Sequence, residues 1–125
     1  MARWVIKNVG MKGVAMAVPE NVVKTSDFDF FSQEEAEVFN NTVGIKRRHI
    51  APDNMCASDM CQAAAEKLLE ELEWERDSID VLLFESVTGD YRTPPTSCIL
   101  QDKLALSENC FCMDIPMGCC GCMYA

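Results

Sequence analysis

The chain has 125 residues, enough for one domain or a part of a larger one, and its 49% apolar content argues against overall disorder. Its net charge of −9 argues against binding to nucleic acid or to an anionic membrane, because both require cations that meet phosphates. No apolar run approaches the ~20 residues of a membrane span and no signal-peptide stretch is present, so we expect a cytoplasmic protein.

The N-terminal third predicts two strands, a short helix and an extended segment. Residues 4–9 and 13–18 have the composition of β segments, and Pro19 closes the second because it cannot donate to a ladder. Ser32 and Glu35 have the spacing of a capping box, which predicts a helix that continues to about Asn40. Residues 44–50 predict a short extended segment that carries three successive cations: Lys46, Arg47 and Arg48.

The remaining chain alternates between helix and strand signals. Residues 58–74 predict the best helix, since apolar side chains recur at helical spacing there. Residues 79–87 contain an uninterrupted apolar run, typical of a strand buried inside a parallel sheet. Residues 93–95 should open a helix that ends near Leu104, with proline in its first turn. A second buried strand is expected at residues 110–115, followed by a turn into a helix at residues 118–125.

This order of elements predicts an α/β fold with a mostly parallel sheet between helices. The last helix has barely begun at Ala125, and the final residues show no stop signal. We therefore expect residues 1–125 to be the N-terminal portion of a larger domain.

The densest chemistry lies near the C-terminus, around Cys119. A buried strand there runs into a glycine-containing turn and then a helix, so a thiol on the turn sits at the positive helix end, which favours the thiolate. The same backbone N–H groups can hold an oxyanion, and such an elbow exposes one side chain at a sheet edge. Cys119 therefore has the setting of a nucleophile for acyl transfer.

Two other interpretations of the cysteines stay open. They can be buried side chains that behave as small apolar residues. Alternatively, four of them can form a metal or redox module, although their spacing is not that of a zinc ribbon. These four are Cys110, Cys112, Cys119 and Cys122.

Six segments in chain order resemble the β-ketoacyl-acyl carrier protein synthase III type of condensing enzyme, which has the thiolase fold. Among them are a "G-x-Y-x-P-E-x-x-V" start, a "T-G-I-x-x-R" segment and a "D-x-x-x-A-C-x-G-F-x-Y-A" end. The matching segments are residues 14–22, 43–49, 63–69, 79–83, 95–101 and 114–125. The resemblance implies a layered αβα fold with helices on both faces of a mixed, mostly parallel sheet, cut just after the nucleophile elbow.

The resemblance also implies a reaction. Cys119 lies five residues after Asp114, at the position of the family's nucleophile, and would be acylated by a thioester. A malonyl-type thioester would then lose CO2, and its carbanion would attack the acyl group; a thiolase-type reaction without decarboxylation is the neighbouring alternative. The family completes its site with a His and an Asn from its second half, and His49 is neither. This segment alone is therefore expected to be an inactive scaffold.

Further implications concern the donor and the assembly. Family members that use acetyl-CoA often hold its adenine with a Trp and an Arg, where this chain has Val38 and Thr42. The resemblance thus allows acyl-CoA or an acidic acyl carrier protein as donor, the latter met by Lys46, Arg47 and Arg48, with no cofactor besides the thioester. Cys122 stands where a Phe is common, so the acyl pocket should differ in shape. The family forms homodimers, and three residues are the expected interface: Tyr91, Arg92 and Pro94.

Overall fold

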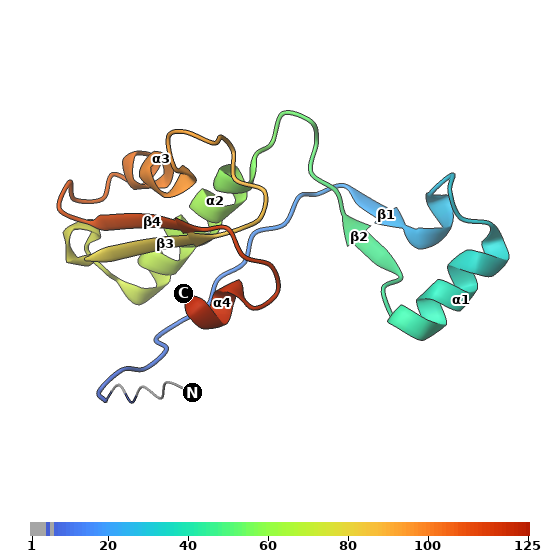
Figure 1. Ribbon diagram of the computed structural model, residues 1–125, viewed down its shortest axis with the longest axis horizontal. Coiled ribbons are helices and arrows are strands. Elements are labelled where there is room, and N and C mark those ends of the chain that lie inside the picture. The colour runs from blue at the N-terminus through green and yellow to red at the C-terminus, as the bar shows by residue number, and fades with distance from the viewer. Residues whose placement is uncertain (1–4, 6) are drawn as a thin grey trace.

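A computed structural model of the chain describes residue 5 and residues 7–125. Its strands are β1 (Val22–Lys24), β2 (Arg47–His49), β3 (Val81–Glu85) and β4 (Phe111–Ile115), and its α-helices are α1 (Gln33–Val43), α2 (Ala57–Leu72), α3 (Thr96–Lys103) and α4 (Gly121–Tyr124). Two short 3-10 turns, η1 (Thr25–Asp27) and η2 (Arg76–Ser78), complete the elements. Figure 1 shows two parts, which we call the hairpin lobe (residues 22–49) and the parallel-strand body (residues 57–124).

The hairpin lobe is built from β1, α1 and β2. The two strands pair antiparallel, with Val23 opposite Arg48. The predicted capping box is confirmed, because the Ser32 side chain accepts from Glu35 N and the Glu35 carboxylate accepts from Ser32 N. The helix runs three residues past the predicted end and stops at Gly44, whose φ of +82° suits glycine.

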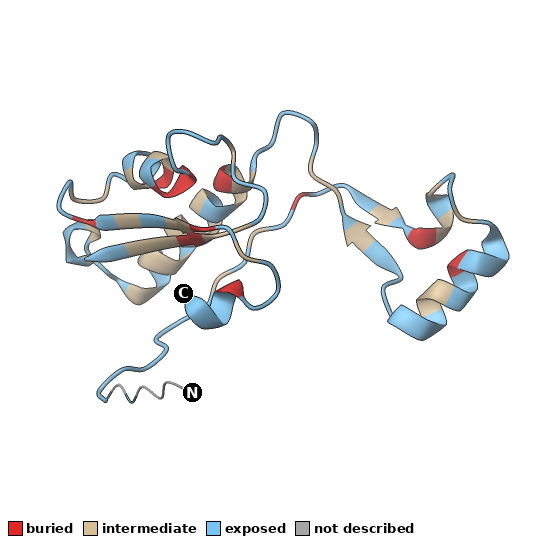
Figure 2. Cartoon of the chain, viewed as in Figure 1, coloured by how far each residue is buried: buried red, intermediate tan, exposed pale blue. Residues whose placement is uncertain are grey.

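The parallel-strand body holds the predicted β–α–β arrangement. Strands β3 and β4 pair parallel, with Phe84 beside Asp114. Helix α3 packs on both strands and α2 packs on α3 (Figure 1). The leucine face of α2 lines a small apolar cavity of about 130 Å³ together with Leu82 and Leu104, so the core lies between the helices and the strands. Figure 2 shows the buried residues as isolated positions in both parts.

The prediction of a strand at residues 13–18 is wrong as stated. Residues alternate in exposure over positions 14–18, but the segment pairs with no strand among the described residues. Gly13 lies close against α2, because a Cβ at this position would be 2.8 Å from Leu68 Cδ1. Of the predicted strand at residues 4–9, positions 4 and 6 lie outside the described residues, and residues 7–9 form no strand. The sequence pattern predicts which residues alternate in exposure, but a β-strand also needs a neighbouring strand to hydrogen-bond with.

The expectation that the two C-terminal strands are buried on both faces is also wrong. Val81, Phe111 and Met113 are 52%, 57% and 42% exposed, and they share one face because side chains alternate along a strand. We call this surface the open face. Only the opposite face, which carries Phe84 and Asp114, meets α3. Across the described part of the chain, no helix combines the length and apolar character that a membrane crossing requires.

Candidate functional site

The turn between β4 and α4 forms the predicted elbow. Cys119 lies in this turn with an exposed side chain, and Cys120 occupies the N-cap position of α4. The turn is closed at both ends, because Met117 N donates to Ile115 O at 2.9 Å and Gly121 N donates to Gly118 O at 2.8 Å. The structure thus places Cys119 where the sequence predicts it, at a strand-to-helix junction.

A carboxylate that the sequence analysis did not single out lies against this elbow. Glu85 ends β3, and its side chain fills the space that a Cβ on Gly121 would need. Gly121 is buried and begins α4, so glycine there allows β3 and the elbow to approach closely. Glu85 reaches the elbow through the tertiary fold, so no local sequence motif predicts its position there.

Asp114 connects the strand that leads to the elbow with helix α3. Its Oδ2 accepts from Thr96 N and its Oδ1 accepts from Ser97 N, both at 2.8 Å. Burial raises the pKa of Asp114, but hydrogen bonds from Ser97 and Thr96 outweigh it and leave the pKa below its ordinary value. The carboxylate is therefore held ionised between the strand and the helix.

The cysteines upstream of the elbow are in a different environment. Cys110 is buried, and Cys112 donates to Cys110 O at 3.6 Å. Burial, aided by neighbouring Cys110, raises the pKa of the Cys112 thiol to about 11, which makes it a poor nucleophile at neutral pH. These two residues fit the interpretation of cysteine as a small apolar residue; the three at the elbow are exposed.

The structure does not gather the four cysteines of the metal hypothesis into a site. Among residues 5 and 7–125, no group of three or more His, Cys, Asp or Glu side chains is arranged to hold a metal ion. All eight cysteines are free thiols.

The three predicted carrier-binding cations fall into two classes. Lys46 and Arg47 are exposed at the start of β2. Arg48 points the other way, with its guanidinium carbon 5.6 Å from the Phe28 ring centroid and 5.4 Å from that of Phe39. Arg48 is therefore engaged inside the hairpin lobe.

Val38 and Thr42 line an open hollow of about 800 Å³ along α1. Val38 is 60% exposed, and the carboxylates of Glu34 and Glu35 line the same hollow. Its wall is thus apolar with an acidic end. His49 lies elsewhere in the lobe, where it is exposed and its Nδ1 donates to the carbonyl of Pro19 at 2.5 Å, in keeping with a surface residue.

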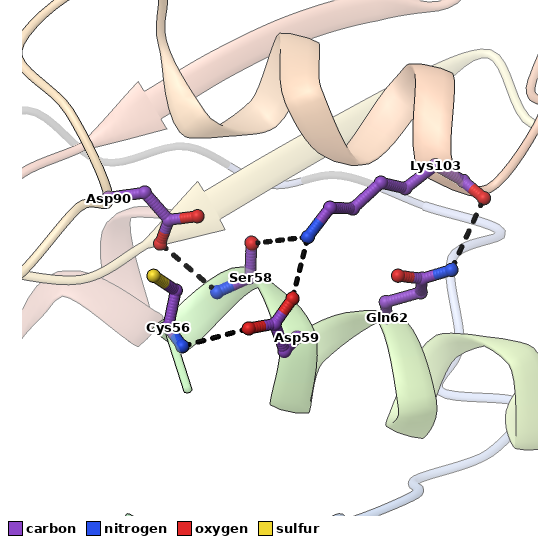
Figure 3. A network of polar contacts seen from close by, with 6 residues as sticks. All are labelled: Cys56, Ser58, Asp59, Gln62, Asp90 and Lys103. Atoms are coloured by element: carbon purple, nitrogen blue, oxygen red, sulfur yellow. Dashed lines mark hydrogen bonds and ion pairs between the residues drawn. The ribbon is translucent and has the colours of Figure 1, made fainter. Parts of the chain in front are cut away.

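The loop between β3 and α3 carries the three predicted interface residues, all exposed: Tyr91, Arg92 and Pro94. Its anchor is Asp90, whose Oδ1 accepts from Ser58 N at 3.2 Å (Figure 3). Lys103 Nζ donates to Ser58 Oγ at 3.0 Å and to Asp59 Oδ1 at 2.7 Å, which joins α3 to the same point on α2. The loop is fixed at its centre, with its outer side chains free.

No family model matches the chain. Over 120 residues it is 34% identical to the beta-ketoacyl-[acyl-carrier-protein] synthase III of Clostridium perfringens. The aligned region covers 96% of this chain and 36% of that protein. The crystal structure of a 3-oxoacyl-(acyl-carrier protein) synthase from Burkholderia xenovorans matches with a TM-score of 0.80 and 38% identity, over 86% of this chain and 32% of that one. The chain resembles a beta-ketoacyl synthase III. A synthase III from Aquifex aeolicus matches equally well in shape, with a TM-score of 0.80 at 27% identity.

These synthase III comparisons confirm the predicted fold class, part of a thiolase-like α/β fold. They also set its extent: the chain spans about a third of the length of the relatives that it matches, for example 36% of the Clostridium perfringens synthase III. The elbow, Glu85 and Asp114 thus lie within a segment of synthase III type.

Proposed function

We propose that this chain supplies the nucleophile of an enzyme that performs a decarboxylative Claisen condensation between an acyl thioester and a malonyl-type thioester. The observation that carries the proposal is the exposed Cys119 in the turn between β4 and α4, within a fold similar to that of synthase III. Because those synthases are about three times as long, the activity belongs to a protein that contains further chain. We expect residues 1–125 alone to give no β-ketoacyl product.

In the first half-reaction the Cys119 thiolate attacks the carbonyl carbon of the acyl thioester. The C–S bond to the carrier breaks, the carrier leaves as a thiol after taking up a proton, and an acyl-cysteine forms. Backbone N–H groups of the elbow are suited to stabilise the oxyanion of the tetrahedral intermediate.

In the second half-reaction the malonyl-type thioester loses CO2, and the electron pair of the broken C–C bond forms a carbanion. This carbanion attacks the acyl-cysteine carbonyl and expels Cys119 as the thiolate, which regenerates the enzyme. The sum consumes one proton and two thioesters and releases a β-ketoacyl thioester, CO2 and a free thiol.

We propose an acyl carrier protein as the acyl donor. The rings of Phe31 and Phe39 lie beside Val38 and Thr42 in the hollow, but the carboxylates of Glu34 and Glu35 there would repel the phosphates of coenzyme A. The exposed cations Lys46 and Arg47 suit the phosphate and carboxylates of an acidic carrier protein. The relatives' printed names include the acyl carrier protein.

A cytoplasmic homodimer is the proposed state of the whole protein. The loop residues Tyr91, Arg92 and Pro94 are the proposed contacts, since their side chains are exposed on a loop that Asp90 anchors. No cofactor besides the thioester enters the proposal.

The test is acylation and alkylation of individual cysteines in the whole protein, followed by peptide-resolved mass spectrometry. Iodoacetamide should label Cys119 first, a donor thioester should protect it, and Cys119→Ala should abolish the acyl-enzyme. Cys120→Ala is the matched control, because it alters the neighbouring exposed thiol of the same turn. Equal labelling of all eight cysteines would overturn the assignment.

The second substrate separates decarboxylative condensation from a thiolase-type reaction. With the acyl-enzyme formed, malonyl thioester should release CO2 and β-ketoacyl product, whereas an acyl-CoA in its place should give none. Product from acyl-CoA without CO2 release would instead establish thiolase-type chemistry.

A further inference from the structure

Helix α3 begins without a local cap. The first N–H groups of a helix need acceptors, and a side chain at the N-cap position usually provides one. Here the N-cap residue is Pro95, which provides no side-chain hydrogen bond. Thr96 and Ser97, the first two residues of α3, are nonetheless fully buried, so water cannot satisfy their N–H groups.

The missing acceptors come from a strand, 17 and 18 residues further along the chain. Asp114 accepts from Thr96 N and from Ser97 N, each at 2.8 Å, with one carboxylate oxygen for each donor. Charge-assisted hydrogen bonds of this kind are about twice as strong as neutral ones. A single side chain of β4 thus caps α3 completely at these two positions.

The same side chain stands directly before the elbow. Asp114 is followed by Ile115, whose carbonyl accepts from Ser86 N at 3.3 Å and from Met117 N at 2.9 Å. The start of the elbow is therefore bound to the end of β3 through Ile115 and to the first turn of α3 through Asp114. No other described side chain hydrogen-bonds α3 to this end of β4.

The contact extends to the loop between β3 and α3. Thr96 Oγ1 accepts from Asp90 N at 3.1 Å, and Asp90 Oδ1 accepts from Ser58 N at 3.2 Å. A continuous chain of hydrogen bonds thus runs from the elbow strand through α3 and the loop to α2. Every backbone donor in it meets a carboxylate or hydroxyl oxygen.

We propose that Asp114 is a positioning residue that fixes the Cys119 elbow relative to α3 and the β3–α3 loop. The inference rests on the proposed function, because it assigns to Asp114 the task of placing a reactive thiol. Displacements of an ångström at a reacting atom can change rates up to a hundredfold, so we expect a loss of roughly tenfold in Cys119 acylation when Asp114 is neutralised.

The test compares Asp114→Asn with Asp102→Asn in the whole protein. Asp102 is an exposed carboxylate near the other end of α3, so it matches the chemical change without the contact. In Asp114→Asn, acylation and alkylation of Cys119 should slow roughly tenfold, while exposed Cys56 keeps its rate and buried Cys110 stays protected. Unfolding would instead expose Cys110.

A second variant separates positioning from helix capping. Pro95→Ser combined with Asp114→Asn gives α3 a local N-cap, which restores amide protection at Ser97 but not the bond to β4. Cys119 should stay slow in this double variant. Full recovery of the Cys119 rate, or an unchanged rate in Asp114→Asn, would overturn the positioning role. Failure of wild-type Cys119 to form an acyl-enzyme would overturn the proposed function instead, whatever the variants do.

Discussion

At the scale of single residues, Arg48 differs from its two cationic neighbours, because its guanidinium has partners inside the hairpin lobe. Its guanidinium lies over two aromatic rings, those of Phe28 and Phe39, and these belong to a row of phenylalanines that contact one another at 4.8–5.3 Å between centroids. An arginine in such a place stabilises the fold through its stem and its planar charge. In the proposed function, carrier recognition therefore rests on the exposed Lys46 and Arg47.

We predict that Arg48→Gln destabilises the hairpin lobe by about 1 kcal/mol, because it removes a cation from two rings. Amide hydrogen exchange in α1 should accelerate accordingly. Arg47→Gln, on the same strand but exposed, should leave exchange unchanged and instead raise the KM for a carrier-bound donor. Equal exchange in the two variants would contradict the division of roles.

At the scale of elements, the junction of β3 with α4 depends on one glycine. Gly121→Ala should disturb the elbow, since the new Cβ would meet the Glu85 side chain; overpacking of this kind costs about 1–3 kcal/mol. Slower alkylation of Cys119 and a lower urea midpoint are the expected results. Gly118→Ala is the control, because the position that its new methyl group would take has no described atom within 4 Å. Adding Glu85→Ala should relieve the Gly121→Ala defect, and a defect that persists would place its cause elsewhere.

The bond between β4 and α3 predicts a pH dependence. The pKa of Asp114 is lower in the folded chain than its ordinary value of about 4. The stabilisation that the ionised carboxylate gives to the folded chain is therefore complete above about pH 4 and is lost as the pH falls through the lower folded pKa. Urea midpoints measured from pH 6 to pH 2 should therefore fall less in Asp114→Asn than in wild type. Asp102→Asn should follow the wild-type slope; parallel curves for all three proteins would refute the linkage.

Local signals predicted the elements well and their partners poorly. The Ser32–Glu35 capping box and the leucine period of α2 act within one or two turns, so the sequence alone identifies them. The cap of α3 could not be found in this way, because its acceptor lies on another element. The sequence does contain one indirect signal: α3 begins after two prolines that offer no side-chain acceptor, so its first N–H groups need an acceptor from elsewhere in the chain.

The site was predictable to the same degree. Cys119 follows from a strand–turn–helix pattern that the chain carries in one short stretch. Glu85 reaches the elbow only because β3 and β4 pair in parallel, with Glu85 beside Ile115. The strand expected at residues 13–18 shows the converse: its alternation is present, but no described strand lies beside it to form a ladder.

At the scale of the whole molecule, the open face is an apolar surface through which copies of the chain can associate. Val81, Phe111 and Met113 lie side by side on the face of β3 and β4 that α3 does not cover, and more than 40% of each is exposed. Contiguous apolar surface of this kind drives association.

We predict that the 125-residue chain self-associates, with an average mass in light scattering that rises with concentration. Phe111→Gln with Met113→Gln should shift it toward the monomer, whereas Val38→Gln, which removes an equally exposed apolar side chain from the hairpin lobe, should not. A chain that stays monomeric at every concentration, or that responds equally to Val38→Gln, would show that the open face does not drive association.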